Sequence, residues 1–126
     1  MDIDALVSNE AKSLNDELRE WTGEIGGEKV SLFSTPLSPY DGKRVEKKYP
    51  GFYDSPSPAA MAYLICLKAI DGNGAQVFKP TKHAPIMERW GLTKISDIAS
   101  VLFKGDFEED LTLEELEKNL SKTSTD

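Results

Sequence analysis

PAAMAYLICLKAI, residues 58–70, decides the fold of this chain. Only Lys68 carries a charge there, so a helix over this stretch would be apolar on nearly every face, and such a helix is normally buried. Ser57 can cap the free N–H groups of its first turn, and Pro58 fits that turn because it lacks an N–H. We therefore expect a central helix over about 58–70, around which the other elements pack.

The stretch DGNG, residues 71–74, follows this helix and could be a calcium loop, a phosphate loop or a plain turn. A calcium loop starting at Asp71 would need glycine where Gln76 stands and glutamate where Lys82 stands. A phosphate loop would lead into a helix, whereas this one leads into the short extended stretch QVF. We therefore expect a turn, in which Gly72 or Gly74 takes the left-handed conformation that stops the helix.

Residues 19–34, REWTGEIGGEKVSLFS, place β-forming residues on both sides of a Gly-Gly pair, which predicts a β-hairpin. Capping and spacing signals predict further helices. These cover 39–48, a short helix opened by Pro85 and closed by Gly91, a helix from Thr93 to about 104, and a last helix from Thr112 to about 120. The predicted fold class is α+β and mostly α-helical, with the helices packed around the central one.

The whole chain, 1–126, is expected to be a single domain, because its length suits one. An amphipathic helix is predicted at the N-terminus, where 1–17 either packs on the core or stays loosely attached until a partner binds it. Residues 121–126 are expected to be a frayed tail. An exposed hairpin edge can pair between subunits, so a homo-oligomer is one expectation.

The net charge of −7 is concentrated near the C-terminus, because residues 106–117 contain seven acids and no base. The remaining acids and bases are equal in number. Such an acidic end would repel a phosphate backbone, so we expect no nucleic-acid partner. No stretch reaches the roughly 20 apolar residues of a membrane span, and the acidic N-terminus does not suit a signal peptide. With Cys66 as the single cysteine, these features favour a soluble protein of a reducing cytosol.

Residues with catalytic potential are few. Cys66 lies in the most apolar segment and is expected to be an inert, packed thiol, and His83 is expected in a surface loop. Together they do not supply the three or four ligands of a zinc site. The acids of 106–117 are clustered rather than held across an apolar cleft. We expect no catalytic, cofactor-binding or metal-binding residue, and hence no enzyme.

Protein binding is the remaining expectation, and the candidate residues are apolar. Leu113, Leu116 and Leu120 form a stripe that could bind a partner helix or dock on this chain's own core. The alternative partner face is Ile3, Val7, Leu14 and Leu18. Trp21 could anchor an interface, because it lies on the hairpin, or could pack in the core.

Three stretches resemble tail assembly chaperones of long-tailed (siphovirus-type) bacteriophages. These are EIGGEKVSLFSTPLSPYD, with a glycine hairpin turn and a serine-led helix; AMAYLICLKAIDGNGAQVFKP, with a nearly all-apolar helix and an Asp-Gly turn; and GLTKISDIASVLFKGDFEEDLTLEELEKNL, with an acidic stretch and a Glu-rich last helix. The resemblance covers about 18–120. The segment 2–17 departs from it, because it is longer than such proteins need.

This resemblance implies a protein that works without catalysis in the host bacterial cytoplasm. It would bind the long, helical tape measure protein, keep it soluble and help recruit tail tube subunits, and it would be absent from the mature virion. A longer form made by ribosomal frameshifting is typical of the family.

The alternative hypothesis is a small acidic adaptor or immunity-type inhibitor, whose acidic end masks a basic partner surface. Neighbouring genes would separate the two. A very long, helix-rich reading frame downstream favours the first, and an adjacent toxin or nuclease gene favours the second.

Overall fold

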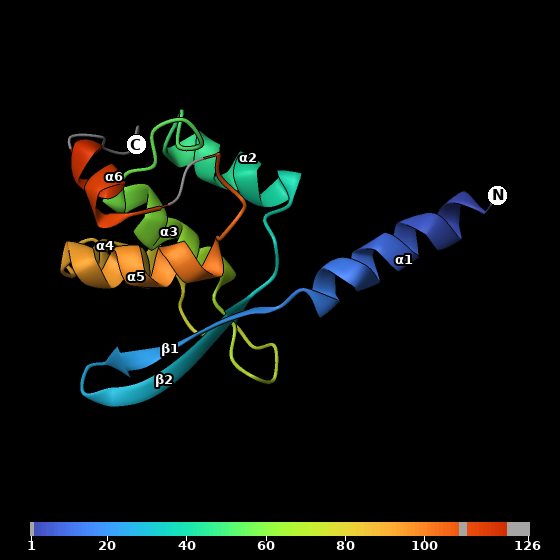
Figure 1. Ribbon diagram of the computed structural model, residues 1–126, viewed down its shortest axis with the longest axis horizontal. Coiled ribbons are helices and arrows are strands. Elements are labelled where there is room, and N and C mark those ends of the chain that lie inside the picture. The colour runs from blue at the N-terminus through green and yellow to red at the C-terminus, as the bar shows by residue number, and fades with distance from the viewer. Residues whose placement is uncertain (1, 109–110, 121–126) are drawn as a thin grey trace.

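The computed structural model describes residues 2–108 and 111–120, without the side chains of 11–16, and has six helices and one two-stranded antiparallel sheet over these ranges. Figure 1 shows a body of packed helices lying over the hairpin, with one further helix that extends away from it. The elements in chain order are α1 (Ile3–Asp16), β1 (Arg19–Ile25), β2 (Glu28–Ser34), α2 (Pro39–Lys48), α3 (Pro58–Lys68), α4 (Pro80–Met87), α5 (Leu92–Leu102) and α6 (Leu113–Lys118). The predicted fold class, α+β and mostly α-helical, is confirmed.

Helix α3 is the centre of the body, as its composition predicts. The Ser57 side chain accepts a hydrogen bond from the Ala60 N–H at 3.1 Å, and Pro58 occupies the first turn. Helices α2, α4 and α5 pack against α3. Most α3 side chains are fully buried and belong to one hydrophobic core, which also includes Leu32 of the hairpin and Leu116 of α6.

Helix α3 ends two residues earlier than predicted, at Lys68, for a tertiary reason. Ile70 leaves the helix and pairs with Phe33 of β2, and the two residues exchange backbone hydrogen bonds of 2.9 Å. The predicted glycine stop is therefore wrong. Gly74 does adopt a positive φ of 83°, but it closes the turn that follows the Ile70 bridge rather than the helix.

The boundaries of two other helices also differ from the prediction. Helix α4 begins at Pro80, and Pro85 lies inside it, because Ala84 and Met87 are both buried on one face. Two side chains three positions apart share a face only if the helix has begun before Pro85. Helix α5 is capped at Gly91, whose carbonyl accepts from the Lys94 and Ile95 N–H groups, so Thr93 is not the cap.

The hairpin has the predicted position and turn. Gly26 and Gly27 adopt φ values of 63° and 85°, which β-branched or bulky residues rarely tolerate, and they bring Ile25 opposite Glu28. Side chains alternate along each strand, so Trp21 and Leu32 face the helices while Thr22 and Ser31 are exposed on the other face. The hairpin therefore packs one face against the core, and its other face is polar at Thr22 and Ser31.

Polar contacts fasten the start of the hairpin to the end of α5. The Arg19 guanidinium forms an ion pair with Asp106 and also donates to the Leu102 carbonyl at 3.0 Å. The Ser34 hydroxyl donates to the same carbonyl at 2.8 Å. Because Arg19 and Ser34 are opposite one another in the hairpin, both strands are held at the C-terminal end of α5.

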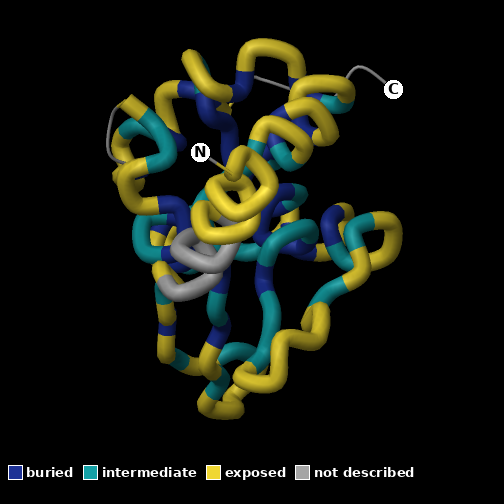
Figure 2. Tube along the Cα trace, turned by 90° about the vertical axis from the view of Figure 1, so that its right-hand side faces the viewer, coloured by how far each residue is buried: buried dark blue, intermediate teal, exposed yellow. Residues whose placement is uncertain are grey.

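Helix α1 projects away from the body in Figure 1, and its first turns are exposed in the end-on view of Figure 2. All residues from Asp2 to Glu10 are exposed. The predicted N-terminal helix is thus present, and no described side chain of 2–10 enters the core. The predicted frayed tail, 121–126, lies outside the described residues.

Candidate functional site

The leucines of α6 do not form one continuous surface stripe. The Thr112 hydroxyl caps the helix by accepting from the Glu115 N–H at 3.1 Å, as its sequence predicts. Leu116 is fully buried and packs in the core together with Leu111. Leu113 and Leu120 are 36% and 55% exposed. The leucines exposed to a partner are therefore Leu113 on α6 and Leu120 just after it, whereas Leu116 packs within this chain.

Trp21 is a core residue rather than a surface anchor. Its side chain is 4% exposed, and its indole Nε1 donates a 2.8 Å hydrogen bond to Oδ2 of Asp97 on α5. The Lys94 ammonium lies 5.6 Å from the centre of the Trp21 ring, within the range of a cation–π contact. In this conformation, Trp21 joins the hairpin to α5 and has little surface left for a partner.

The predicted alternative partner face is exposed at its described positions, with Ile3, Val7 and Leu18 at 69%, 64% and 52%, and the side chain of Leu14 lies outside the described residues. The large apolar side chains described on α1 are Ile3, Val7 and Leu6, and Leu6, which the prediction omitted, is 51% exposed. With about 100° between successive residues, these three side chains fall within one third of the helix circumference. A group of large apolar side chains on one side of a helix that leaves the body is typical of a protein-binding element.

A second apolar surface lies where the hairpin turn meets the start of α5. Two adjoining hollows share Trp90, and we call them together the Trp90 groove. The first, of about 400 Å³, is lined by Ile25, Gly26, Trp90, Gly91 and Lys94. The second, of about 240 Å³, is lined by Phe78, His83, Ile86, Met87 and Trp90. Ring edges meet ring faces along it, because Phe78 makes T-shaped contacts with both His83 and Trp90.

Sequence reasoning did not find this groove. The sequence contains one indication of the groove: Ile86 and Trp90 are four residues apart and have bases on either side. Two residues are too few to predict an apolar helix face. The groove also needs Ile25 from the hairpin, 65 positions away in sequence from Trp90. Only the tertiary structure brings these side chains together.

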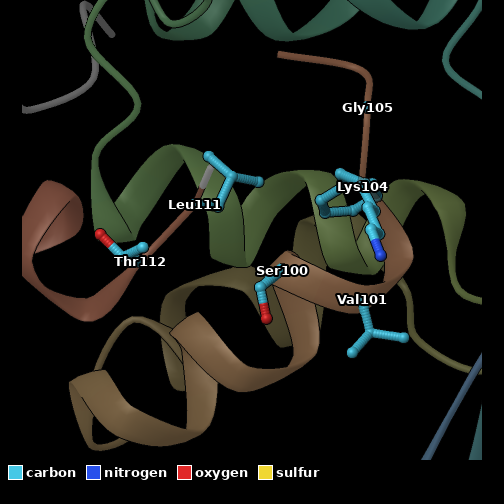
Figure 3. Close-up of a pocket in the computed structure, with 7 residues that line it drawn as sticks. Ser100, Val101, Lys104, Gly105, Leu111 and Thr112 are labelled. Carbon is cyan, nitrogen blue, oxygen red and sulfur yellow. The ribbon is translucent and has the colours of Figure 1, made fainter. Parts of the chain in front are cut away.

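A larger hollow, of about 460 Å³, lies beside the C-terminal end of α5. Figure 3 shows Ser100 and Val101 of α5 on one side of it and Leu111 and Thr112 on another. Its two hydroxyls already have local roles: Ser100 donates to the Asp97 carbonyl at 3.0 Å, and Thr112 caps α6. Lys104 is the charged group in its lining, so the hollow offers no paired acid and base among its lining residues.

Cys66 is buried, as its apolar surroundings predict. Burial and, to a smaller extent, the Glu88 carboxylate raise the pKa of the Cys66 thiol to about 12. A thiol with this pKa carries almost no thiolate at neutral pH, and the thiolate is the nucleophilic form.

His83 lies in α4 and not in a loop as predicted. Its Nδ1 accepts a hydrogen bond from the Lys79 N–H at 3.3 Å, which satisfies a donor at the start of the helix. The imidazole is therefore part of a helix start and of the groove wall.

The DGNG stretch is a turn organised by Asp71. Its Oδ1 accepts from the N–H groups of Asn73 at 2.8 Å and Ala75 at 3.0 Å. The Asp71 carboxylate thus accepts hydrogen bonds from the backbone of the turn itself. Across the part of the chain that the structure describes, no group of three or more His, Cys, Asp or Glu side chains is placed to hold a metal ion.

Within the described ranges, no helix has the length and apolar character needed to cross a membrane. Comparison of the chain with protein-family models, with curated proteins and with solved structures found no match. The candidate surfaces therefore rest on the geometry described above: the exposed face of α1, the Trp90 groove, and the two exposed leucines of α6.

Proposed function

We propose that this protein is a tail assembly chaperone of a long-tailed bacteriophage. It binds the helical tape measure protein, keeps it soluble and helps recruit tail tube subunits. It acts by binding, without covalent chemistry, in the host bacterial cytoplasm, and it is absent from the mature virion. The proposal has two separate supports: the family resemblance of about 18–120, and, in the segment outside that resemblance, the exposed apolar face of α1, which projects from a body that has its own core.

The exposed face of α1 suits a helical partner. Ile3, Leu6 and Val7 lie on one side of a 14-residue helix, which is the arrangement with which amphipathic helices enter apolar grooves or pair with other helices. Transfer of one such side chain from water to an interface contributes on the order of 1.5–3 kcal/mol before the costs of association. The apolar repeat continues in the sequence to Leu14 and Leu18, which would add to this contribution.

The position of α1 also suits transient binding. The body keeps its core whether α1 is occupied or not, because no residue of 2–10 belongs to that core. A partner can therefore be bound and released without unfolding of the chaperone. Such reversible binding is required of a chaperone that protects a long apolar helix and is later replaced on that helix by the tube subunits.

Co-expression with the candidate tape measure protein tests the proposal. We expect the tape measure protein to be soluble with the wild-type chain and insoluble without it. The double variant Ile3→Gln, Val7→Gln keeps helix-forming residues while removing two exposed apolar side chains, and it should leave most of the tape measure protein insoluble. Leu120→Gln is the matched control, since it removes an exposed apolar side chain that follows α6.

Two results would count against the proposal. If the tape measure protein is equally insoluble with and without the wild-type chain, the chaperone function is wrong. If solubilisation survives the α1 variant but is lost with Leu120→Gln, the α6 leucines carry the contact, and the role assigned to α1 is wrong.

A further inference from the structure

We propose that the Trp90 groove of one copy of this chain holds helix α1 of a second copy. This inference goes beyond the proposed function and concerns the protein alone, but it uses the same face of α1 that the proposed function assigns to the tape measure protein, so one α1 cannot make both contacts at once. It rests on three properties of the described residues: the apolar floor of the groove, the charges around it, and the place where α1 leaves the body.

The groove presents apolar surface that a helix can cover. Ile86 is 61% exposed, and Trp90 is partly exposed and lines both hollows. The hairpin contributes Ile25 to the opposite side. Trp90 lies between the two hollows, one of which is lined by the hairpin turn and the other by α4. A bound helix with apolar side chains four residues apart could place them in contact with this apolar surface.

Bases lie close to the groove on its α4 side. Lys82 is exposed one helical turn before Ile86 on α4, and Arg89, also exposed, follows the end of that helix at Met87. Lys94 lines the hollow beside the hairpin. Between residues 79 and 94 the chain has four bases and one acid, and that acid, Glu88, accepts a 2.6 Å hydrogen bond from the Tyr49 hydroxyl. On its hairpin side the groove adjoins the exposed acids Glu24 and Glu28, so its complementarity to an acidic helix with an apolar stripe lies on the side of α4 and Lys94.

Helix α1 is a helix of this kind. Its stripe contains Ile3, Leu6 and Val7, all exposed. Asp4 and Glu10 are exposed as well; helical geometry places Asp4 beside the stripe and Glu10 in line with it, one turn beyond Val7. The segment 2–17 contains five acids and one base. An apolar stripe with an acid beside it and an acid at its end thus faces a groove with an apolar floor and nearby bases.

The path of the chain favours a second copy over the same copy. Helix α1 connects to Arg19 at one end of β1, whereas the groove lies beside Ile25 and Gly26 at the other end. Figure 1 shows α1 extending away from the end of the body opposite the hairpin turn. In this arrangement α1 cannot cover its own groove. Two copies that exchange α1 would form a closed, two-fold dimer, since each supplies one helix and one groove.

Sedimentation velocity over a range of concentrations tests this inference. We expect a mass that rises toward that of two copies as the concentration increases. Ile86→Gln in the groove and Ile3→Gln with Val7→Gln in α1 should each weaken self-association by about tenfold or more. Leu120→Gln is the matched control, because it also removes an exposed apolar side chain. Leu120 lines neither hollow and does not lie on α1, so this variant should leave self-association unchanged. Circular dichroism verifies that each variant keeps its helical content.

Mixing the variants gives a sharper test. The groove variant retains an intact α1, and the α1 variant retains an intact groove, so the mixture can form one of the two contacts. We expect the mixture to self-associate more strongly than either variant alone. Reversing the rim charges with Lys82→Glu and Arg89→Glu should also weaken self-association, and high salt should do the same to the wild-type chain.

Three results would overturn the inference. A wild-type mass of one copy at all concentrations would mean that no second copy binds. Loss of self-association with the α1 variant, but not with Ile86→Gln or the charge reversals, would mean that α1 pairs outside the groove. Self-association that none of these variants affects would place the contact elsewhere, for example at the hairpin edge.

Discussion

The indole Nε1 of Trp21 lies 2.8 Å from Oδ2 of Asp97 and donates a hydrogen bond to it, although 76 positions separate the two residues in sequence. Trp21 is 4% exposed, so burial has removed its N–H from bulk water and Asp97 supplies the replacement acceptor. The bond connects the centre of β1 to the exposed side of α5. It also holds one wall of the region in which Ile25 and Lys94 form the Trp90 groove.

Asp97→Ala removes this acceptor and is expected to destabilise the fold by about 1–3 kcal/mol, the cost of an unsatisfied buried donor. Urea unfolding should show a lower midpoint with an unchanged slope. Thr93→Ala, also on α5 but exposed, serves as the control and should change the free energy of unfolding by less than about 0.5 kcal/mol. Equal midpoints for both variants would mean that the Trp21–Asp97 bond contributes nothing measurable.

Gly23→Ala is expected to displace the Trp21 ring. A Cβ at this position would lie 2.5 Å from Cζ2 and 2.7 Å from Cη2 of Trp21, and the ring cannot easily move because Asp97 holds its nitrogen. We expect a loss of about 1–3 kcal/mol in the free energy of unfolding, as for other overpacked sites. Tryptophan fluorescence should report the altered surroundings of the ring.

Gly72→Ala is the matched control for that change. Its Cβ would have its nearest neighbour at 4.0 Å, an atom of the Phe33 ring, and Gly72 has no positive φ. We expect the free energy of unfolding to stay within about 0.5 kcal/mol of the wild-type value. If Gly23→Ala is tolerated as well as Gly72→Ala, the ring of Trp21 is not held as tightly as its contacts indicate.

Asp41 should make stability depend on acid pH. Burial raises the pKa of its carboxyl, but hydrogen bonds from the Ser38 backbone and from Lys68 outweigh burial, so the pKa lies below its ordinary value of 3.8. A lowered folded-state pKa stabilises the fold above the unfolded pKa, and this contribution is lost as pH falls through the folded pKa. Asp41→Asn should therefore cost about 1.5–3 kcal/mol at pH 7, and the difference from wild type should shrink below pH 3.8.

Urea unfolding at a series of pH values measures this difference. Asp54→Asn is the control, because Asp54 is exposed; its difference from wild type should be small at every pH. A difference between Asp41→Asn and wild type that stays constant below pH 3.8 would show that the Asp41 charge is not the source of the effect.

Cys66 should be protected from thiol reagents in the folded protein. Its side chain is fully buried, and burial raises its pKa to about 12, so both access and thiolate content are low. We expect a disulfide reagent at pH 8 to react only as fast as the chain opens, and the rate to rise with urea. A Cys66→Ala chain carrying Thr22→Cys, on the exposed face of the hairpin, should react at once. Immediate reaction of wild-type Cys66 would contradict the buried position.

Local sequence patterns predicted the element types well. The nearly all-apolar stretch from Pro58, the Gly26-Gly27 turn and the serine and threonine caps each act through neighbours within one or two turns of chain, so the sequence alone contains their cause. The predicted face of Ile3, Val7, Leu14 and Leu18 includes two of the three exposed residues of the α1 stripe and omits Leu6. Helix starts near Pro85 and Thr93 were misplaced, because α4 begins at Pro80 and α5 after Gly91 without a side-chain cap that the sequence could have shown.

Periodicity and capping are local properties, and they were sufficient to predict helices around an apolar α3 and one hairpin. The end of α3 depends on a contact between distant segments, because Ile70 pairs with Phe33. The tertiary structure also determines that Trp21 and Leu116 are buried while Ile86 and Trp90 line a groove with Ile25. Which apolar side chains remain available to a partner depends on contacts between distant segments, and those contacts have no signature in any short stretch of sequence.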